Sequence, residues 1–400
     1  MEIEQIGHVI QKWYQTEPWH GLRGRIYDKS AQKHEFKAII DLIDGIEATL
    51  KCGGDQCVFN QVVNTYLKTT KVFEPDILKM IFNRQMVNST VDFFERAKAF
   101  DAEMSFEDIG QAMRNVWIIN MIQQLEKQEV SLTDSAFAYS MLYPYTDNLL
   151  DDDSVEYSNK KKCMMRFGKR LGGMRLDAEN PYEECIFRLV EIVEDEFPRD
   201  EFPTVFSSML AIHRAQLESQ RQHKEEVFAY EVPIVELTFN KGGTSVLADA
   251  YFVSQRLTES QIRFYCHYGV VLQLCDDLQD FIEDESRGHW TIYNTQCGRP
   301  LDRLILKTLA FNEEMVREID DENWKRVYEG CILMMIATAC FGLSNKFSKS
   351  FYREVLKYAP VSPKQLQKLS RRVVKLKSQM GIASQIEMMK GLVQKLELDS

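Results

Sequence analysis

The sequence has few of the features that build β-sheets, membrane spans and signal peptides. Ten prolines in 400 residues leave room for long helices, and apolar and polar residues almost never alternate as they do in strands. The longest apolar run, residues 331–343, is shorter than the roughly 20 residues of a membrane-spanning helix. The first residues include acids where a signal peptide has bases, and no apolar core follows. We therefore expect a soluble protein without a signal peptide.

Cysteine pairs, excess positive charge and common catalytic motifs are also missing. The nine cysteines form no CxxC pair and have no histidine at zinc-ligand spacing, which indicates a reducing compartment, the cytoplasm. A net charge of −11 disfavours nucleic acid or an anionic membrane as the main partner. The sequence contains neither GxSxG nor GxGxxG, and KGGTS at 241–245 is not a P-loop. A basic segment, residues 357–377, fits either peripheral membrane contact or a solvated helix face.

Helical periodicity runs through almost the whole chain. Three capping patterns support helix starts: Ser105 with Asp108, Thr258 with Gln261, and Ser362 with Gln365. The predicted helices cover residues 32–50, 57–68, 91–101, 106–128, 133–150, 158–170, 181–196, 203–230, 245–256, 259–284, 300–319, 322–347 and 363–396. The expected loops are residues 18–27, 172–181, 240–244 and 288–300. No repeat or composition shift marks a boundary, so we predict one all-α helical-bundle domain over residues 1–400.

An acidic stripe in residues 269–289 is the strongest feature of the sequence. At 100° per residue, its polar residues fall within roughly a 100° arc of one helix face. They are Gln273, Asp276, Asp277, Asp280 and Asp284. Carboxylates four residues apart destabilise an isolated helix by about 0.2–0.5 kcal/mol per pair. Either a bound cation offsets this repulsion or the stripe is a solvated face, and the long apolar flanks favour the cation.

A second acidic cluster ends residues 139–153. Three of its residues share about 80° of a helix face; they are Tyr143, Asp147 and Asp151. Asp152 and Asp153 follow, and Pro144 predicts a kink or break just before the acids. These acids are either loop aspartates at a helix end or part of a site, and the helix macrodipole disfavours negative charge there. Two such faces supply the hard oxygen ligands that a multi-magnesium site needs.

These two clusters resemble motifs of a known enzyme superfamily. Residues 269–280, GVVLQLCDDLQD, resemble the second aspartate-rich motif of the trans-isoprenyl diphosphate synthases, and Asp147-Asn-Leu-Leu-Asp151 resembles the first motif shared with class I terpene synthases. Further stretches, in the same order, are similar to the bacterial large terpene synthases, the tetraprenyl-β-curcumene synthase group: Lys51–Gly54, Thr146–Ser154, His213–Gln220, Gly242–Tyr251 and Asp276–Asn294. The resemblance spans residues 50–295.

The resemblance implies an isoprenoid synthase fold that ionises a linear all-trans polyprenyl diphosphate with three Mg²⁺ ions. The implied metal ligands are Asp147, Asp151, Asp152, Asp276, Asp277, Asp280 and Asp284, of which Asp147, Asp151, Asp276 and Asp280 carry the catalysis. Magnesium bridging carboxylate and diphosphate oxygens would neutralise the charge that develops on the leaving group. Helical spacing alone does not rank Asp277 and Asp284 as outer ligands.

Four polar side chains are candidates to hold the departing diphosphate: Arg214, Lys241, Gln273 and Arg287. Arg214 and Arg287 fit ordinary surface or ion-pair roles equally well. Lys241 is favoured because the two glycines after it would offer backbone N–H groups at a helix start. Tyr143, one turn before Asp147, is the candidate to stabilise a carbocation through its ring face, although core packing is its alternative role.

Two departures from the prenyltransferase pattern favour cyclisation or elimination over chain elongation. The first motif has a single aspartate and no arginine pair soon after it, since Arg166 and Arg170 come late, and His289 replaces the basic residue after the second motif. We therefore expect a terpene synthase that releases diphosphate and a hydrocarbon or alcohol. The alternatives are a prenyltransferase of the elongating or head-to-head kind and a non-enzymatic helical scaffold. No nucleic-acid partner is expected, and a homodimer is compatible with the sequence.

Overall fold

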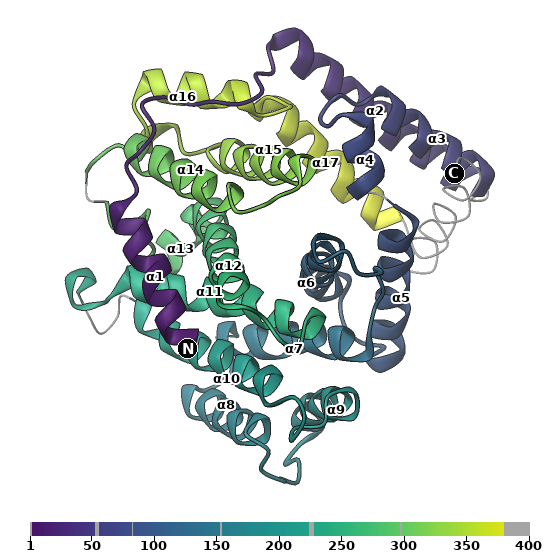
Figure 1. The fold of residues 1–400 in the computed structure, drawn as a ribbon. Helices are drawn as coiled ribbons and strands as arrows, with labels where there is room; N and C mark the ends of the chain where they lie inside the picture. The colour runs from purple at the N-terminus through teal and green to yellow at the C-terminus, as the bar shows by residue number, and fades with distance from the viewer. Residues whose placement is uncertain are drawn as a thin grey trace. The chain divides into compact units, whose positions relative to one another are not determined.

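The computed structural model of the chain is all-α, as the sequence predicts (Figure 1). It describes residues 2–52, 56–81, 83–152, 154–223, 228–296 and 298–379. Within these ranges α-helices and short 3₁₀ turns account for the regular structure, and one isolated bridge joins His223 and His289. None of the helices in these ranges is both long and apolar enough to cross a membrane.

The chain forms two compact units. Of the described residues, those within 2–81, 215–245 and 259–379 form unit 1, and those within 83–214 and 246–258 form unit 2. Unit 1 contains α1 (Glu2–Gln15), α2 (Lys29–Lys51), α3 (Gln56–Thr69), α4 (Pro75–Ile81), α12 (Glu259–Gln279), α13 (Phe281–Arg287), α14 (Asp302–Val316), α15 (Glu322–Ala339), α16 (Lys349–Val355) and α17 (Pro363–Gln379). Unit 2 contains α5 (Arg84–Phe100), α6 (Phe106–Leu125), α7 (Asp134–Asp151), α8 (Tyr157–Leu171) and α9 (Pro181–Glu196). Helices α10 (Pro203–Ser219) and α11 (Ile234–Val253) contribute residues to both.

Helix α12 is the central helix of unit 1 and packs against α1, α14 and α15 (Figure 1). Its apolar residues Val270, Val271, Leu274 and Leu278 are completely buried. Aromatic rings complete this core, because Tyr268 of α12 meets Tyr328 of α15 edge-on with ring centroids 4.8 Å apart. A helix buried on most sides has little surface left for charge, so its acidic stripe is confined to one face.

Helix α7 is central to unit 2 and packs against α6 and α9. Thr133 caps its start by accepting a hydrogen bond from the Ala136 N–H. The helix continues through Pro144 as far as the acidic cluster, so the sequence-based alternative of a break at this proline is wrong. A proline inside a helix costs one backbone hydrogen bond. The packing of α7 against α6 and α9 outweighs this cost in free energy.

Several predicted boundaries differ from the structure for identifiable reasons. The segments that form α1, α4 and α16 had no predicted helix, and α4 and α16 have only seven residues each, less than two full turns of periodicity. Residues 240–244, expected as a loop, lie inside α11. The helices predicted at 203–230 and 322–347 end at Ser219 and Ala339. The predicted end of the last helix, at 396, lies outside the described residues.

Candidate functional site: two acidic clusters

The acidic stripe of unit 1 crosses from α12 to α13. The predicted single helix at 259–284 is interrupted at Asp280, which caps α13 with φ −92° and ψ 9°. The Asp280 N–H still donates to the Asp276 carbonyl at 2.9 Å, and the Asp284 N–H donates to the Asp280 carbonyl at 2.9 Å. Because this spacing of four residues is kept through the interruption, the three aspartates follow one another along one face.

Asp277 is the most buried acid of the stripe, with 8% of its surface exposed. The Gln273 Nε2 donates to its Oδ1 at 2.8 Å, whereas its buried Oδ2 has no hydrogen-bond partner. Burial raises the pKa of Asp277 to about 8; the charges of Asp276 and Asp284 add to this rise, and the Gln273 hydrogen bond and Lys241 oppose it. A buried carboxyl oxygen without a donor is an available ligand for a hard cation.

Asp284, half-buried on α13, is perturbed in the same direction. Burial raises its pKa to about 7, with contributions from the negative charges of Asp280 and Asp276, and Lys241 lowers it. Lys241 is therefore close enough to act electrostatically on both perturbed acids. The resulting donor set of carboxylate oxygens fits Mg²⁺, which binds such oxygens together with water.

The position of Lys241 corrects the sequence-based expectation about its backbone. Lys241 and the two glycines after it lie in the middle of α11, where N–H groups are used in the helix, so they are not a free cradle at a helix start. Gly242 has a packing role instead. A Cβ at this position would lie 2.6 Å from the Gln273 Cβ and 2.7 Å from the Gly269 carbonyl oxygen. The missing side chain lets α11 approach α12 beside the stripe.

Arg287 is the last residue of α13 and is exposed. It forms an ion pair with Glu283 at 2.8 Å, one turn back on the helix, which matches the surface role left open from the sequence. Gly288 ends the helix with φ 70°, a left-handed conformation that favours glycine. His289 then pairs with His223, their ring centroids 5.1 Å apart.

The acidic cluster of unit 2 lies at the C-terminal end of α7. Tyr143 and Asp147 are both half-buried and one helical turn apart. Asp151 is the last residue of α7, and its side chain lies outside the described part, as does Asp153. Asp152 is exposed and accepts hydrogen bonds from Ser154, at 2.8 Å from the N–H and 2.6 Å from the hydroxyl. These bonds lower the pKa of Asp152, so its charge is retained in acid.

Arg214, the fourth candidate for diphosphate binding, is exposed on α10 of unit 2. Its neighbour His213 is buried, packs edge-on against Phe167 with ring centroids 5.0 Å apart, and sits against the backbone of Gly168. Burial, together with the smaller effect of the Arg214 charge, lowers the pKa of His213 to about 4, so the histidine is neutral at physiological pH. His213 therefore supports the packing of α8 on α10.

Arg166 and Arg170 are engaged in ion pairs between α8 and α9. The guanidinium of Arg170 makes two bonds to Glu194, of 2.7 and 2.6 Å, and the Nε of Arg166 donates to Glu183 at 2.6 Å. Such paired, fork-shaped contacts fix the geometry of both partners. These arginines hold α8 and α9 together within unit 2.

Asp249 is a chemically distinctive residue outside both acidic clusters predicted from the sequence. It belongs to the part of α11 in unit 2, is fully buried, and neither carboxyl oxygen has a hydrogen-bond partner of ordinary geometry. Burial raises the pKa of Asp249 well above its ordinary value, and nearby Asn115 only partly opposes this rise. Tyr139, whose ring lies at a tilt against Phe252, is close to Asp249. Burial and then the charge of Asp249 raise the pKa of Tyr139. A lone acid in the apolar stretch SVLADAYFV was the available signal.

The sequence-predicted residues thus fall into two groups, one in each unit. Gln273, Asp276, Asp277, Asp280 and Asp284 belong with Lys241 in unit 1, and Tyr143, Asp147, Asp151 and Asp152 belong to unit 2. Among the residues that the structure describes, no three His, Cys, Asp or Glu side chains are grouped for metal binding as they stand. No protein-family model matches the chain, and no curated protein or solved structure shows significant similarity to it.

Proposed function

We propose that the protein is a class I terpene synthase, a cytoplasmic enzyme that ionises a linear all-trans polyprenyl diphosphate and closes or deprotonates the resulting carbocation. The observation that carries the proposal is the stripe of α12 and α13, in which Asp277 and Asp284 are driven toward the protonated state by burial and by neighbouring acids. Four aspartates on one partly buried face repel one another, and a bound cation would offset this repulsion. The second acidic cluster on α7 supports the same chemistry.

Each side chain has a distinct task in this mechanism. Asp276, Asp280, Asp147 and Asp151 would hold Mg²⁺, with Asp277 and Asp284 as further ligands once they lose their protons. Bound Mg²⁺ supplies Lewis-acid stabilisation of the departing diphosphate. Lys241 adds a positive charge beside the stripe, and Gln273 orients Asp277 through its 2.8 Å hydrogen bond. The ring of Tyr143 offers its face to a carbocation, a contact worth about 0.5–2 kcal/mol.

The decisive experiment offers the purified protein Mg²⁺ and geranylgeranyl or geranylfarnesyl diphosphate, with and without isopentenyl diphosphate. We expect inorganic diphosphate and a hydrocarbon or alcohol in the organic extract without isopentenyl diphosphate. A longer diphosphate that forms only when isopentenyl diphosphate is present would instead identify a prenyltransferase. Absence of turnover under both conditions would favour the scaffold alternative.

Two variants control this experiment. Asp276→Asn keeps the size of the side chain and removes a metal ligand, so we expect turnover to fall by about 100-fold or more, since even the outer partners of metal ligands contribute about 10–100-fold. Glu259→Gln changes an exposed acid at the start of the same helix and should leave turnover unchanged. Equal activity of both variants would contradict a metal-binding role for the stripe.

A further inference from the structure

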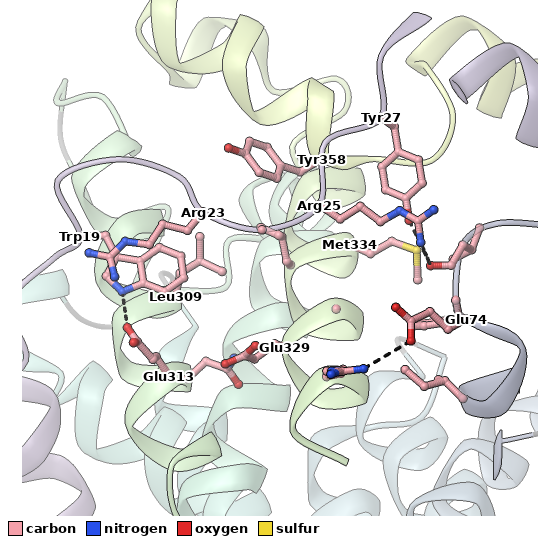
Figure 2. A pocket seen from close by; sticks show the side chains of 18 residues that line it. Trp19, Arg23, Arg25, Tyr27, Glu74, Leu309, Glu313, Glu329, Met334 and Tyr358 are labelled. Atoms are coloured by element: carbon pink, nitrogen blue, oxygen red, sulfur yellow. Dashed lines mark hydrogen bonds and ion pairs between the residues drawn. The ribbon is translucent and has the colours of Figure 1, made fainter. Parts of the chain in front are cut away.

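A cavity of about 390 Å³ lies within unit 1, apart from the acidic stripe (Figure 2). Its walls come from the segment between α1 and α2, from the start of α4 and the residues before it, and from helices α14 and α15, with Tyr358 closing one side. None of the stripe residues lines it. A volume of this size is within the range of small-molecule sites.

The segment that covers the cavity is held in place at several points. The Trp19 N–H donates to the Leu306 carbonyl at 3.3 Å, and the Tyr27 N–H donates to the Lys357 carbonyl at 2.6 Å. Between them, the Tyr358 hydroxyl donates to the Leu22 carbonyl at 3.1 Å. Gly24 has φ 128° at the point where the segment passes over Leu333. The cavity is therefore formed by fixed backbone before any ligand arrives.

Most charged groups around the cavity already have partners. Glu313 accepts from the Trp19 indole at 2.7 Å and from Arg317 at 2.9 Å, and Arg326 pairs with Glu74 at 3.3 Å. Arg23 and Arg25 lie over the rings of Trp19 and Tyr27, 5.2 and 5.1 Å from the ring centroids. Figure 2 shows Trp19, Arg23 and Glu313 on one side of the cavity and Arg25, Tyr27 and Glu74 on the other.

Two acceptors remain on the floor, where α14 and α15 meet. The Glu329 carboxylate is exposed to solvent, has no ion pair or hydrogen bond within the described part of the chain, and lies between Glu313 and Glu74 in Figure 2. Asn312 is 3% exposed, and its Oδ1 has no hydrogen-bond partner. Desolvation and the negative charges of Glu313 and Glu322 raise the pKa of Glu329, and Lys325, which is ion-paired with Glu322, only partly opposes this rise. The cavity thus contains two acceptors without a hydrogen-bond partner, the Glu329 carboxylate and the Asn312 Oδ1.

The rest of the lining is apolar or aromatic. It includes Phe73, Leu309, Leu333, Met334 and Tyr358. Aromatic faces attract organic cations, and apolar walls bury hydrocarbon. A ligand that matches both features has one positively charged donor and an apolar body.

We propose that this cavity binds a primary organic ammonium ion with an apolar body, with Glu329 as its counter-ion. The ammonium group donates to the Glu329 carboxylate and toward Asn312, and the body lies along Leu333 and Met334. Because no residue of the acidic stripe lines the cavity, this site is separate from the proposed active site. The ligand also has the opposite charge to a prenyl diphosphate, so the inference does not depend on the proposed function.

The test uses three probes of one length: 4-phenylbutylamine, 4-phenylbutanol and 4-phenylbutyrate. Calorimetric titration of the full chain should show the amine binding at least about tenfold more tightly than the alcohol or the acid, a difference of about 1.4 kcal/mol. Glu329→Gln should weaken the amine by about tenfold and leave the alcohol unchanged. Glu184→Gln, at an exposed position on α9, is the matched control and should change neither. Tighter binding of the acid, equal binding of all three probes, or an unchanged Glu329→Gln variant would overturn the proposal.

Gly330 provides a second test that does not alter charge. It lines the cavity from α15, and a Cβ added there makes only ordinary contact, 3.5 Å from the Phe73 ring. Gly330→Leu should therefore fill the cavity and abolish amine binding without lowering the melting temperature, whereas Gly330→Ala should retain binding. Neither change should affect turnover of a prenyl diphosphate. Amine binding that survives in Gly330→Leu would place the probe elsewhere and refute the assignment.

Discussion

Asp277 shows how a buried acid can be tolerated in a fold when its carboxyl group holds a proton. Its Oδ1 has the Gln273 amide, its Oδ2 has no hydrogen-bond partner, and two further aspartates act on it. Leaving one oxygen of a buried charged group without a donor costs about 1–3 kcal/mol or more. The fold tolerates this cost because the carboxyl can hold a proton, and a bound cation would remove the need for that proton.

The stability of the metal-free protein should consequently fall as pH rises through this region. The pKa of Asp277 is raised to about 8 in the fold, compared with roughly 3.9 in an unfolded chain. The folded state therefore holds the extra proton between these two values, and its stabilising effect is lost with increasing pH, by up to about 1.4 kcal/mol per pH unit. Asp277→Asn cannot lose a proton and should flatten this dependence.

Urea denaturation at pH 5.5 and pH 8, without Mg²⁺, measures the effect. The wild type should lose more unfolding free energy between these values than Asp277→Asn, and Glu259→Gln should behave like the wild type. If Asp277→Asn shows the same loss as the wild type, Asp277 is already ionised at pH 5.5 and the stripe is hydrated.

At the scale of elements, the crossing of α11 over α12 positions Lys241 beside the stripe. Gly242→Ala would bring a Cβ against the Gly269 carbonyl oxygen, a backbone atom that cannot move without its helix. Overpacking of this kind typically costs about 1–3 kcal/mol, against about 1 kcal/mol gained from helix propensity. We expect a lower melting temperature, together with weaker Mg²⁺-dependent turnover because Lys241 shifts with α11.

Gly7 offers a matched control for this change. It lies on α1 in the same unit, and a Cβ there meets no atom within 4 Å. Gly7→Ala should therefore raise the unfolding free energy by about 0.5–1 kcal/mol through helix propensity alone. Thermal denaturation of both variants separates the two effects, and a Gly242→Ala variant as stable as Gly7→Ala would mean that the helices cross less closely.

Gly242 and Gly243 show which structural features can be predicted from the local sequence and which cannot. The low helix propensity of glycine led to the prediction of a loop at residues 240–244. In the structure these residues are helical, and the close contact of Gly242 with Gly269 and Gln273 favours a residue without a side chain there. Periodicity was sufficient for the helix predicted at 181–196, whose bounds match α9, because that helix buries a single face. It could not detect the interruption at Asp280, since a cap of one residue leaves the spacing of the apolar side chains intact.

The candidate site was predictable to a similar extent. Spacing along one helix was enough to place Asp276, Asp277, Asp280 and Asp284 on one face, because helical geometry fixes that relation locally. Asp249 was not predicted as a site residue, because a single acid forms no periodic pattern with other acids. Its significance comes from its complete burial by other helices. Whether the aspartates of α7 serve the same reaction as those of α12 is a long-range question that helical spacing does not address.

At the scale of the whole molecule, the proposed function requires the acidic clusters of both units to act on one diphosphate. A ligand bound only by the folded state stabilises it by about 2.7 kcal/mol when its free concentration is 100 times its dissociation constant. Mg²⁺ with inorganic diphosphate should therefore raise the melting temperature, and neither component alone should do so to the same extent. Magnesium alone would lack the diphosphate oxygens as further ligands, and diphosphate alone would meet the negative charge of the aspartates.

Asp147→Asn in unit 2 and Asp276→Asn in unit 1 test whether the two clusters share this ligand. If they do, each substitution removes most of the melting-temperature increase, and the double variant loses little more than either single one, because residues that act on one ligand are not additive. Glu184→Gln and Glu259→Gln, one exposed acid in each unit, should keep the full increase. Losses that simply add would indicate two independent cation sites, and a class I mechanism would then lack its shared diphosphate.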